Sequence, residues 1–138
     1  FISQGHHSIV VDHIEKVNIL GDIIEMKSAV TNLVSNAVRY TPQGGSIVVS
    51  SFFNDEGLVI SVKDNGIGIA ADAIPRVTER FYRVDKSRSR ETGGTGLGLA
   101  IVKHVLFRHQ ARLKILSELG KGSDFQIILP KDRVEKIV

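Results

Sequence analysis

The chain has no cysteine and no tryptophan among its 138 residues, and only 6% of them are aromatic. Without cysteine there is no disulfide framework and no thiol or cysteine-based zinc chemistry, which is typical of a protein in the reducing cytosol. Scarce aromatic residues leave few platforms for stacking the bases of a single strand, so we expect no nucleic-acid partner. No apolar run approaches the roughly 18 residues of a membrane span, so we expect no direct membrane contact.

The residues that are present are typical of a globular domain with a weakly basic surface. Hydrophobic residues make up 42% of the sequence and charged residues 24%, and the formal net charge is +3 at pH 7. We expect residues 1–138 to form a single domain, monomeric in isolation, that can bury its own core. The positive charge favours a small anionic ligand. The chain opens at Phe1 without an initiator methionine or a targeting segment, so we expect a piece of a longer protein.

Apolar residues at helical spacing predict two helices and a helical fragment. The first helix begins after Asp22, a suitable N-cap, and ends before Thr41–Pro42. The second is predicted at 97–107. A short helical piece, broken near Pro75, is predicted at 70–80.

Runs rich in β-branched residues predict six strands, at 8–11, 17–20, 46–53, 58–64, 112–117 and 124–129. The turn composition of residues 54–57 favours an antiparallel hairpin between the third and fourth of these. Strands in hairpins with helices between them indicate an α+β fold, in which helices cover one face of a mostly antiparallel sheet.

Four glycines stand in the run 92–99, directly before the second predicted helix. Glycine lets the backbone approach an anion, and the helix adds its positive N-terminal end, so the run suits a phosphate group. Alone, such a run is more often a turn. It is not a Rossmann turn, because no strand precedes it. The chain also lacks a P-loop and the His-Arg-Asp and Asp-Phe-Gly signatures of eukaryotic-type protein kinases.

Three polar residues share one face of the first predicted helix. Asn32, Asn36 and Arg39 fall within an arc of about 60° if each residue advances by about 100°. A solvated helix face is the simpler interpretation. A side-chain carbonyl is also a hard oxygen donor, suited to Mg²⁺ that takes its other ligands from water and nucleotide phosphates, and Arg39 then lies one turn further on, near those phosphates.

Asp64 ends an apolar strand on the side that faces the core. A buried carboxylate needs donors, which are either backbone N–H groups of a local turn or an amino group of a ligand. The following residues, Gly66 to Ile69, permit a close approach and supply an apolar wall. This combination favours an adenine whose exocyclic amine donates to Asp64.

Residues 76–91 lack periodicity and carry more cations than anions. The cations are Arg76, Arg80, Arg83, Lys86, Arg88 and Arg90. A solvated charged loop is one interpretation. A basic loop hinged on Gly93 and Gly94 also suits a lid over a triphosphate, with an arginine or lysine on the γ-phosphate.

Several of these motifs occur together and in order over almost the whole chain. The chain resembles the catalytic, ATP-binding domain of bacterial sensor histidine kinases, in the superfamily that also holds DNA gyrase, Hsp90 and MutL. The matching segments are 32–40 (N box), 64–69 (G1 box), 78–85 (F box), 94–99 (G2 box) and the glycine turn 120–123. Within the family, residues 78–105 are most similar to kinases that sense phosphate. One departure is Thr78, where the F box often begins with phenylalanine.

The resemblance implies a Bergerat-type (GHKL) two-layer α/β sandwich, with a mixed, mostly antiparallel sheet of about five strands under three helices on one face. It implies Mg²⁺ on Asn36, phosphate and nucleoside contacts at Arg39 and Tyr40, and the adenine amine on Asp64. Further ATP contacts are implied at Asn32, Gly66, Gly68, Ile69, Arg83, Lys86, Gly94, Thr95, Gly96, Leu97, Gly98 and Leu99. The implied catalytic residues are Asn36, Arg39, Arg80 and Arg83.

The implied reaction is transfer of the γ-phosphoryl group of ATP to a histidine on a separate dimerisation domain of the same protein, upstream of a response regulator. None of the five histidines has a phosphoacceptor context, so we expect that domain to be absent from the chain. For His6, His7, His13, His104 and His109 we predict surface or packing roles. The family also leads us to expect a cytoplasmic domain of a parent anchored in the inner membrane.

Two other functions stay open. Hydrolytic ATPases of the same superfamily carry a glutamate as base four residues before the metal-binding asparagine. Here that position is Asn32, an amide that cannot take a proton from water, which disfavours hydrolysis. The other function is a nucleotide-sensing or basic nucleic-acid-binding module without chemistry, for which salt-dependent DNA binding without ATP affinity would be diagnostic.

Overall fold

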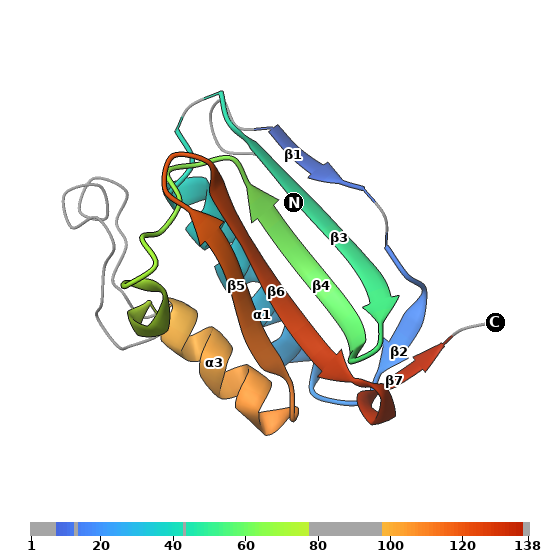
Figure 1. Cartoon of the computed structure of the whole chain (residues 1–138). Coiled ribbons are helices and arrows are strands. Elements are labelled where there is room, and N and C mark those ends of the chain that lie inside the picture. The colour runs from blue at the N-terminus through green and yellow to red at the C-terminus, as the bar shows by residue number, and fades with distance from the viewer. Residues whose placement is uncertain (1–7, 13, 43, 78–97, 137–138) are drawn as a thin grey trace.

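The computed structural model describes residues 8–136 except positions 13, 43 and 78–97. A sheet of five strands runs in the order β1, β3, β4, β6, β5 (Figure 1). The strands are β1 (Ser8–Val11), β3 (Ser46–Asn54), β4 (Gly57–Asp64), β5 (Arg112–Glu118) and β6 (Gly122–Pro130). β1 pairs in parallel with β3, and the other neighbours are antiparallel. The predicted mixed, mostly antiparallel sheet is confirmed.

The hairpin of β3 and β4 forms because its turn satisfies its own backbone. The side-chain oxygen of Asn54 accepts hydrogen bonds from the backbone nitrogens of Glu56 at 2.9 Å and Gly57 at 3.3 Å, as asparagine does in tight turns. Gly57 has a φ of 141°, which a residue with a side chain rarely adopts. The hairpin fixes the register that places Asp64 at the end of the central strand β4.

Two α-helices cover one face of the sheet, behind it in Figure 1. They are α1 (Ile23–Arg39) and α3 (Gly98–Arg108). Asp22 caps α1, because its carboxylate accepts a hydrogen bond from the backbone nitrogen of Glu25 at 3.0 Å. No described helix is long and apolar enough to cross a membrane.

The prediction differs from the structure in two elements. The helical piece expected at 70–80 is a single 3-10 turn, η1 (Ile74–Arg76), within the part of that segment that is described. Pro75, in the first turn, prevents a helix through the residues before it. The described residues therefore form two α-helices rather than three, although the α+β class holds. The second difference is a small antiparallel sheet of β2 (Val17–Ile19) and β7 (Val134–Lys136), of which β7 and the preceding turn η2 (Lys131–Arg133) were not predicted.

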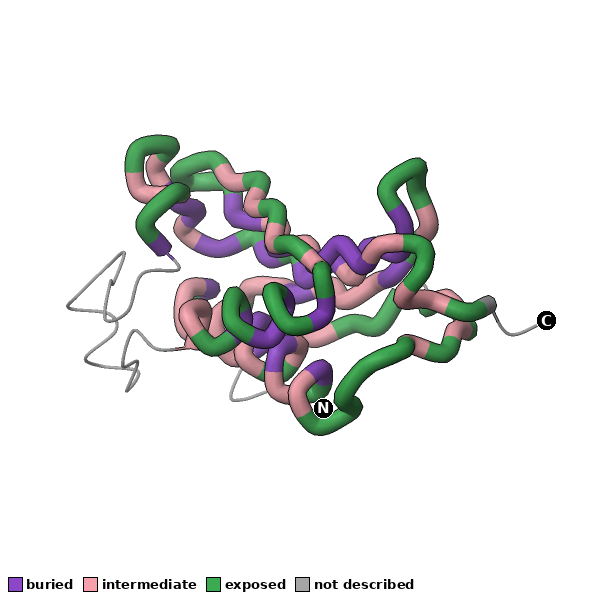
Figure 2. Tube along the Cα trace, turned by 90° about the horizontal axis from the view of Figure 1, so that it is seen from below, coloured by how far each residue is buried: buried purple, intermediate pink, exposed green. Residues whose placement is uncertain are grey.

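The hydrophobic core lies between the two helices and the sheet. Figure 2 shows the buried positions gathered where these layers meet. The fully buried side chains of this cluster include Leu33 from α1, Leu106 from α3, and Leu58 and Ile127 from the sheet. Burial of these apolar surfaces is the main stabilising contribution to the fold.

His109 joins the two helices at one end of this core and is only 3% exposed. Its Nδ1 lies 2.8 Å from the backbone oxygen of Val105, and its Nε2 lies 3.0 Å from the backbone nitrogen of Asp22. A neutral ring that donates from Nδ1 and accepts at Nε2 satisfies both contacts. Gly21 fits beside the ring because an added Cβ would lie 2.2 Å from it. His109 therefore has a packing role.

Candidate functional site

The polar face of α1 lies against the first residue of α3. The side-chain nitrogen of Asn32 donates to the backbone oxygen of Ser28 at 2.8 Å and lies 3.3 Å from the Ser28 hydroxyl. A Cβ added at Gly98 would lie 3.1 Å from Oδ1 of Asn32 and 3.7 Å from Nη2 of Arg39. The fold therefore brings together Asn32, Arg39 and Gly98, which belong to motifs far apart in the sequence.

Asp64 is the buried carboxylate of the site, with 7% of its surface exposed. Its Oδ1 accepts hydrogen bonds from the backbone nitrogens of Gly66 at 2.8 Å and Ser123 at 3.3 Å. Within the described residues no hydrogen bond reaches its Oδ2. Of the two kinds of donor predicted for Asp64, the local backbone N–H groups are therefore present on one oxygen. An amino group of a ligand on the other oxygen stays a prediction.

Burial raises the pKa of the Asp64 carboxyl above its ordinary value. Desolvation is the largest cause, because it disfavours the charged form. The two backbone hydrogen bonds oppose the rise in pKa, and repulsion from the Asp124 carboxylate adds to it. The protein therefore holds a destabilised carboxylate beside a cavity, which is typical of functional sites.

The glycines after Asp64 allow the loop to pack closely against neighbouring backbone. A Cβ at Gly66 would lie 2.2 Å from the backbone oxygen of Tyr40, and one at Gly68 would lie 2.1 Å from that of Glu118. Gly68 also has a φ of 73°. The loop is thus wedged between the end of α1 and the turn that joins β5 to β6. Its glycines are required first by this packing, whereas their predicted contact with ATP stays a prediction.

Two serines, Ser117 on β5 and Ser123 on β6, lie in register with Asp64 across the sheet. Ser123 is the cross-strand partner of Asp64 on β4 and of Ser117 on β5. The hydroxyl of Ser117 accepts a hydrogen bond from the backbone nitrogen of Ile69 at 2.7 Å. Ser123 belongs to the glycine turn 120–123, but no role was predicted for either serine, because the pairing of distant strands sets their positions.

A small cavity connects the predicted motifs. It is lined by Asn36, Tyr40, Asp64, Gly68, Ile69, Val77, Leu99, Ser123 and Phe125, and its volume is about 20 Å³. Of these residues, Val77, Ser123 and Phe125 were not predicted. The volume is close to that of one water molecule, so a nucleobase fits only if the lining residues move apart. Gly66 is absent from the described lining, and no described side chain bonds to the amide of Asn36.

Other predicted residues lie outside the described residues. They are Arg80, Arg83, Lys86, Gly94, Thr95, Gly96 and Leu97. Their predicted roles as lid and phosphate contacts stay predictions. The described residues also contain no cluster of three or more histidine, aspartate or glutamate side chains suited to a metal.

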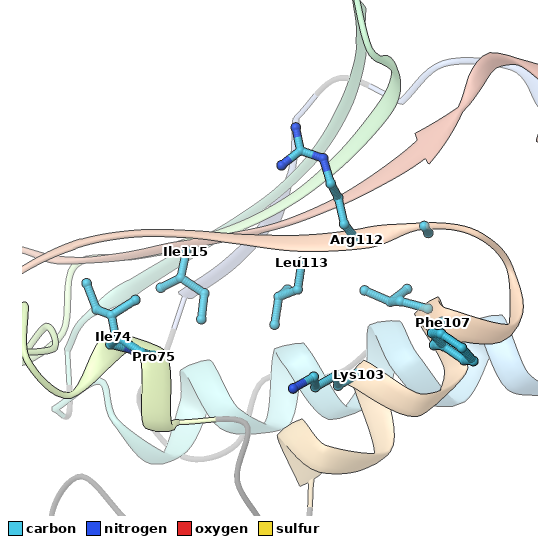
Figure 3. Close-up of a pocket in the computed structure, with 9 residues that line it drawn as sticks. Ile74, Pro75, Lys103, Phe107, Arg112, Leu113 and Ile115 are labelled. Atoms are coloured by element: carbon cyan, nitrogen blue, oxygen red, sulfur yellow. The ribbon is translucent and has the colours of Figure 1, made fainter.

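A larger cavity, of about 440 Å³, lies between η1, α3 and β5. Figure 3 shows Ile74, Leu113 and Ile115 on its walls, with Lys103 at the rim. Its lining is mainly apolar and contains none of the residues predicted for ATP. The ligand site predicted from Asp64 therefore does not lie here, because Asp64 lines the smaller cavity and an open hollow of about 540 Å³ that Ser117 and Ser123 also line.

Residues 21–133 match the family described as histidine kinase-, DNA gyrase B-, and HSP90-like ATPases, and the chain belongs to this family. The chain is 54% identical over 125 residues to the phosphate regulon sensor protein PhoR of Pseudomonas aeruginosa. This match covers 90% of the chain but 28% of that protein, so the chain spans less than a third of its relative's length.

Two solved structures share the fold. The mycobacterial sensor histidine kinase MprB aligns with a TM-score of 0.82 at 29% identity, over 96% of this chain and 86% of that one. Full-length ShkA in complex with AMPPNP aligns with a TM-score of 0.76 at 29% identity, over 96% of this chain and 26% of that one. The predicted family and fold are thus confirmed.

Proposed function

We propose that the domain binds Mg²⁺-ATP and donates the γ-phosphoryl group to a histidine on a separate dimerisation domain of the same protein. The observation that carries the proposal is the Oδ2 of Asp64. This oxygen belongs to a buried side chain, has no hydrogen-bond partner among the described residues, and lies at a cavity that Asn36 also lines. An adenine amine that donates to this oxygen replaces the water lost on burial. The AMPPNP complex of ShkA supports an adenine nucleotide in this fold.

The phosphates then extend towards the junction of α1 and α3. The first turn of α3 has backbone N–H groups without partners inside the helix and a partial positive charge, and Arg39 adds a full charge close to Gly98. Asn36 offers a neutral oxygen to Mg²⁺, which is otherwise held by phosphates and water. Bound there, Mg²⁺ would neutralise the charge that develops on the phosphates.

Asn32 makes hydrolysis the weaker alternative. Its amide nitrogen donates to Ser28, and an amide has no basic oxygen that takes a proton from an attacking water. Phosphoryl transfer to a histidine instead depends mainly on in-line positioning and charge neutralisation. Because the named relatives include a phosphate regulon sensor protein, we propose phosphate sensing through a response regulator as the context of the parent protein.

The deciding experiment supplies the domain with a histidine-bearing dimerisation domain of a related sensor kinase and ATP labelled in its γ-phosphate. Acid-labile label on the partner is expected, with no label when the partner's histidine is replaced by alanine. Steady release of inorganic phosphate without the partner would favour the ATPase. Absence of ATP binding together with salt-dependent binding to DNA would favour the module without chemistry.

The metal assignment has its own test. Asn36→Ala is expected to lose most of the gain in ATP affinity that Mg²⁺ gives the parent domain, at least about tenfold. Thr31→Ala, an exposed position on the same helix, is the matched control and should keep the gain. Titration calorimetry with and without Mg²⁺ measures both. Equal Mg²⁺ dependence in Asn36→Ala and the parent would show that the metal is held elsewhere.

A further inference from the structure

Ser117 is the cross-strand neighbour of Ser123, which lines the cavity, and it sets the direction of the hydrogen bond between the two hydroxyls. Its hydroxyl oxygen lies 3.0 Å from the backbone oxygen of Gly122 and 2.7 Å from the hydroxyl oxygen of Ser123. It also accepts from the backbone nitrogen of Ile69 at 2.7 Å. A serine hydroxyl has one hydrogen and two lone pairs, so these three contacts use all of its capacity.

The geometry determines which group donates. The Gly122 carbonyl has no hydrogen, so the contact with Ser117 is a hydrogen bond only if Ser117 donates. Ser117 then has no hydrogen left for Ser123. The 2.7 Å contact between the two hydroxyls therefore uses the hydrogen of Ser123. The reverse arrangement would leave two oxygens 3.0 Å apart with no hydrogen between them.

This arrangement affects Ser123, which lines the cavity together with Asp64. With its hydrogen committed to Ser117, its hydroxyl oxygen has only lone pairs to offer a ligand or a bridging water. Asp64, its partner across the strands, likewise offers the lone pairs of Oδ2. This wall of the cavity therefore presents two acceptors and no donor.

We infer that Ser117 is a specificity-determining residue that makes the site select 6-amino purines over 6-oxo purines. The inference rests on the proposed binding of ATP at this site. The amine of adenine can donate to the Asp64 and Ser123 oxygens. A 6-oxo group has no hydrogen to donate, so its oxygen would face two other acceptors without a hydrogen bond. Sites that match the hydrogen bonds of one ligand discriminate strongly against an analogue that leaves polar groups unpaired.

Ser117 also has a structural role, because it holds Ile69 of the loop. If the role of Ser117 were only structural, its substitution would lower the affinity for all nucleotides by the same factor. The ratio of affinities for ATP and ITP separates the two roles, since these ligands share ribose and triphosphate and differ only at position 6 and its neighbouring ring nitrogen. The direction in which the Ser123 hydroxyl donates changes this ratio, because it decides whether the site offers a hydrogen to a 6-oxo group.

The experiment measures ATP and ITP binding by titration calorimetry for the parent, Ser117→Ala, Ser117→Thr, Ser123→Ala and the double variant. Ser117→Ala frees the Ser123 hydrogen to meet a 6-oxo group, so the preference for ATP over ITP should fall by about five- to tenfold. Ser117→Thr keeps a hydroxyl and should retain the preference of the parent. In the Ser123→Ala background, Ser117→Ala should leave the ratio unchanged.

Two results would overturn the inference. The first is an unchanged ratio of ATP to ITP affinity in Ser117→Ala, whether or not both affinities fall, and the second is a ratio change of the same size in the Ser123→Ala background. Each would leave the proposed function intact if the parent binds ATP. Failure of the parent to bind either nucleotide would instead contradict the proposed function and the inference with it.

Discussion

The two ends of α1 each hold a buried polar side chain, but the two side chains differ in how completely they are bonded. Near the start of the helix, His109 is 3% exposed and both of its ring nitrogens have partners. Near the end, Asp64 is 7% exposed and only Oδ1 has partners among the described residues. All hydrogen-bonding atoms of the His109 ring therefore have partners, whereas Asp64 keeps Oδ2 for the ligand that we propose. Burial alone therefore does not distinguish a structural polar group from a functional one.

The difference also appears in energetic terms. A buried group with all of its hydrogen bonds made costs little. The Asp64 carboxyl keeps a raised pKa despite two backbone hydrogen bonds, because desolvation outweighs them. Its charged form is thus less stable in the folded domain than in water. In the proposed complex, a ligand amine that donates to Oδ2 would relieve this cost and so contribute to the binding free energy.

The largest effect on stability is expected from a substitution of His109, near the start of α1. His109→Ala removes two hydrogen bonds and leaves a cavity between the helices, so the free energy of unfolding should fall by about 2–4 kcal/mol. The affinity of the folded domain for ATP should stay unchanged, because His109 lies at the opposite end of α1. Chemical denaturation and calorimetry measure the two quantities.

His104, an exposed residue on α3 five positions before His109, is the matched control. His104→Ala is expected to change the unfolding free energy by less than about 0.5 kcal/mol. A loss of ATP affinity in His109→Ala under conditions where it is fully folded would contradict the assignment of separate roles to the two ends.

A comparison of Gly68 with Gly120 tests how tightly the loop after Asp64 is packed. Gly68 and Gly120 both have positive φ, of 73° and 80°. A Cβ at Gly68 would lie 2.1 Å from the Glu118 oxygen, whereas one at Gly120 would have nothing within 4 Å. Gly120→Ala should therefore cost about 1 kcal/mol for conformation alone, and Gly68→Ala about 1–3 kcal/mol more for the clash.

Equal melting temperatures for the two variants would show that the loop has room at Gly68. In that case the packing account of the glycines after Asp64 would be wrong.

A smaller effect is expected in the pH dependence of Asp64→Asn. The folded-state pKa of Asp64 is raised above its ordinary value of 3.8, so the folded domain binds this proton more tightly than the unfolded chain does. Stability therefore falls as pH rises from 3.8 through the raised pKa, and stays constant above it. Asp64→Asn lacks this loss. Its melting temperature relative to the parent should increase over the same range.

Comparing the two proteins at each pH cancels the titration of the other carboxyl groups. A relative melting temperature that decreases with pH would mean that the pKa of Asp64 is lowered rather than raised. The two backbone hydrogen bonds would then outweigh desolvation.

The elements that depend on local pattern were predictable from the sequence. The spacing of apolar residues and the Asp22 cap determine α1, and the turn around Asn54 determines the hairpin of β3 and β4. Alternation along β4 correctly predicted a buried Asp64. In these cases the physical cause lies within a few residues of its effect.

The features that depend on distant pairing were not predictable in this way. β7 has three residues and no distinctive pattern, and it forms because it pairs with β2. Ser117 and Ser123 reach the site through the register of β5, β6 and β4, which no local pattern specifies. The helical pattern at 70–80 also overstated the described part of that segment, where Pro75 stands in the first turn of η1 and prevents a helix through the residues before it.

The central claim is that Asp64 is kept partly unpaired for adenine, and ATP titration of Asp64→Asn beside the parent at neutral pH tests it most directly. The account predicts an affinity lower by about 10- to 100-fold, as for a lost hydrogen bond to a charged group, with a melting temperature no lower than that of the parent. Unchanged affinity, or an affinity lost only together with stability, would contradict the claim.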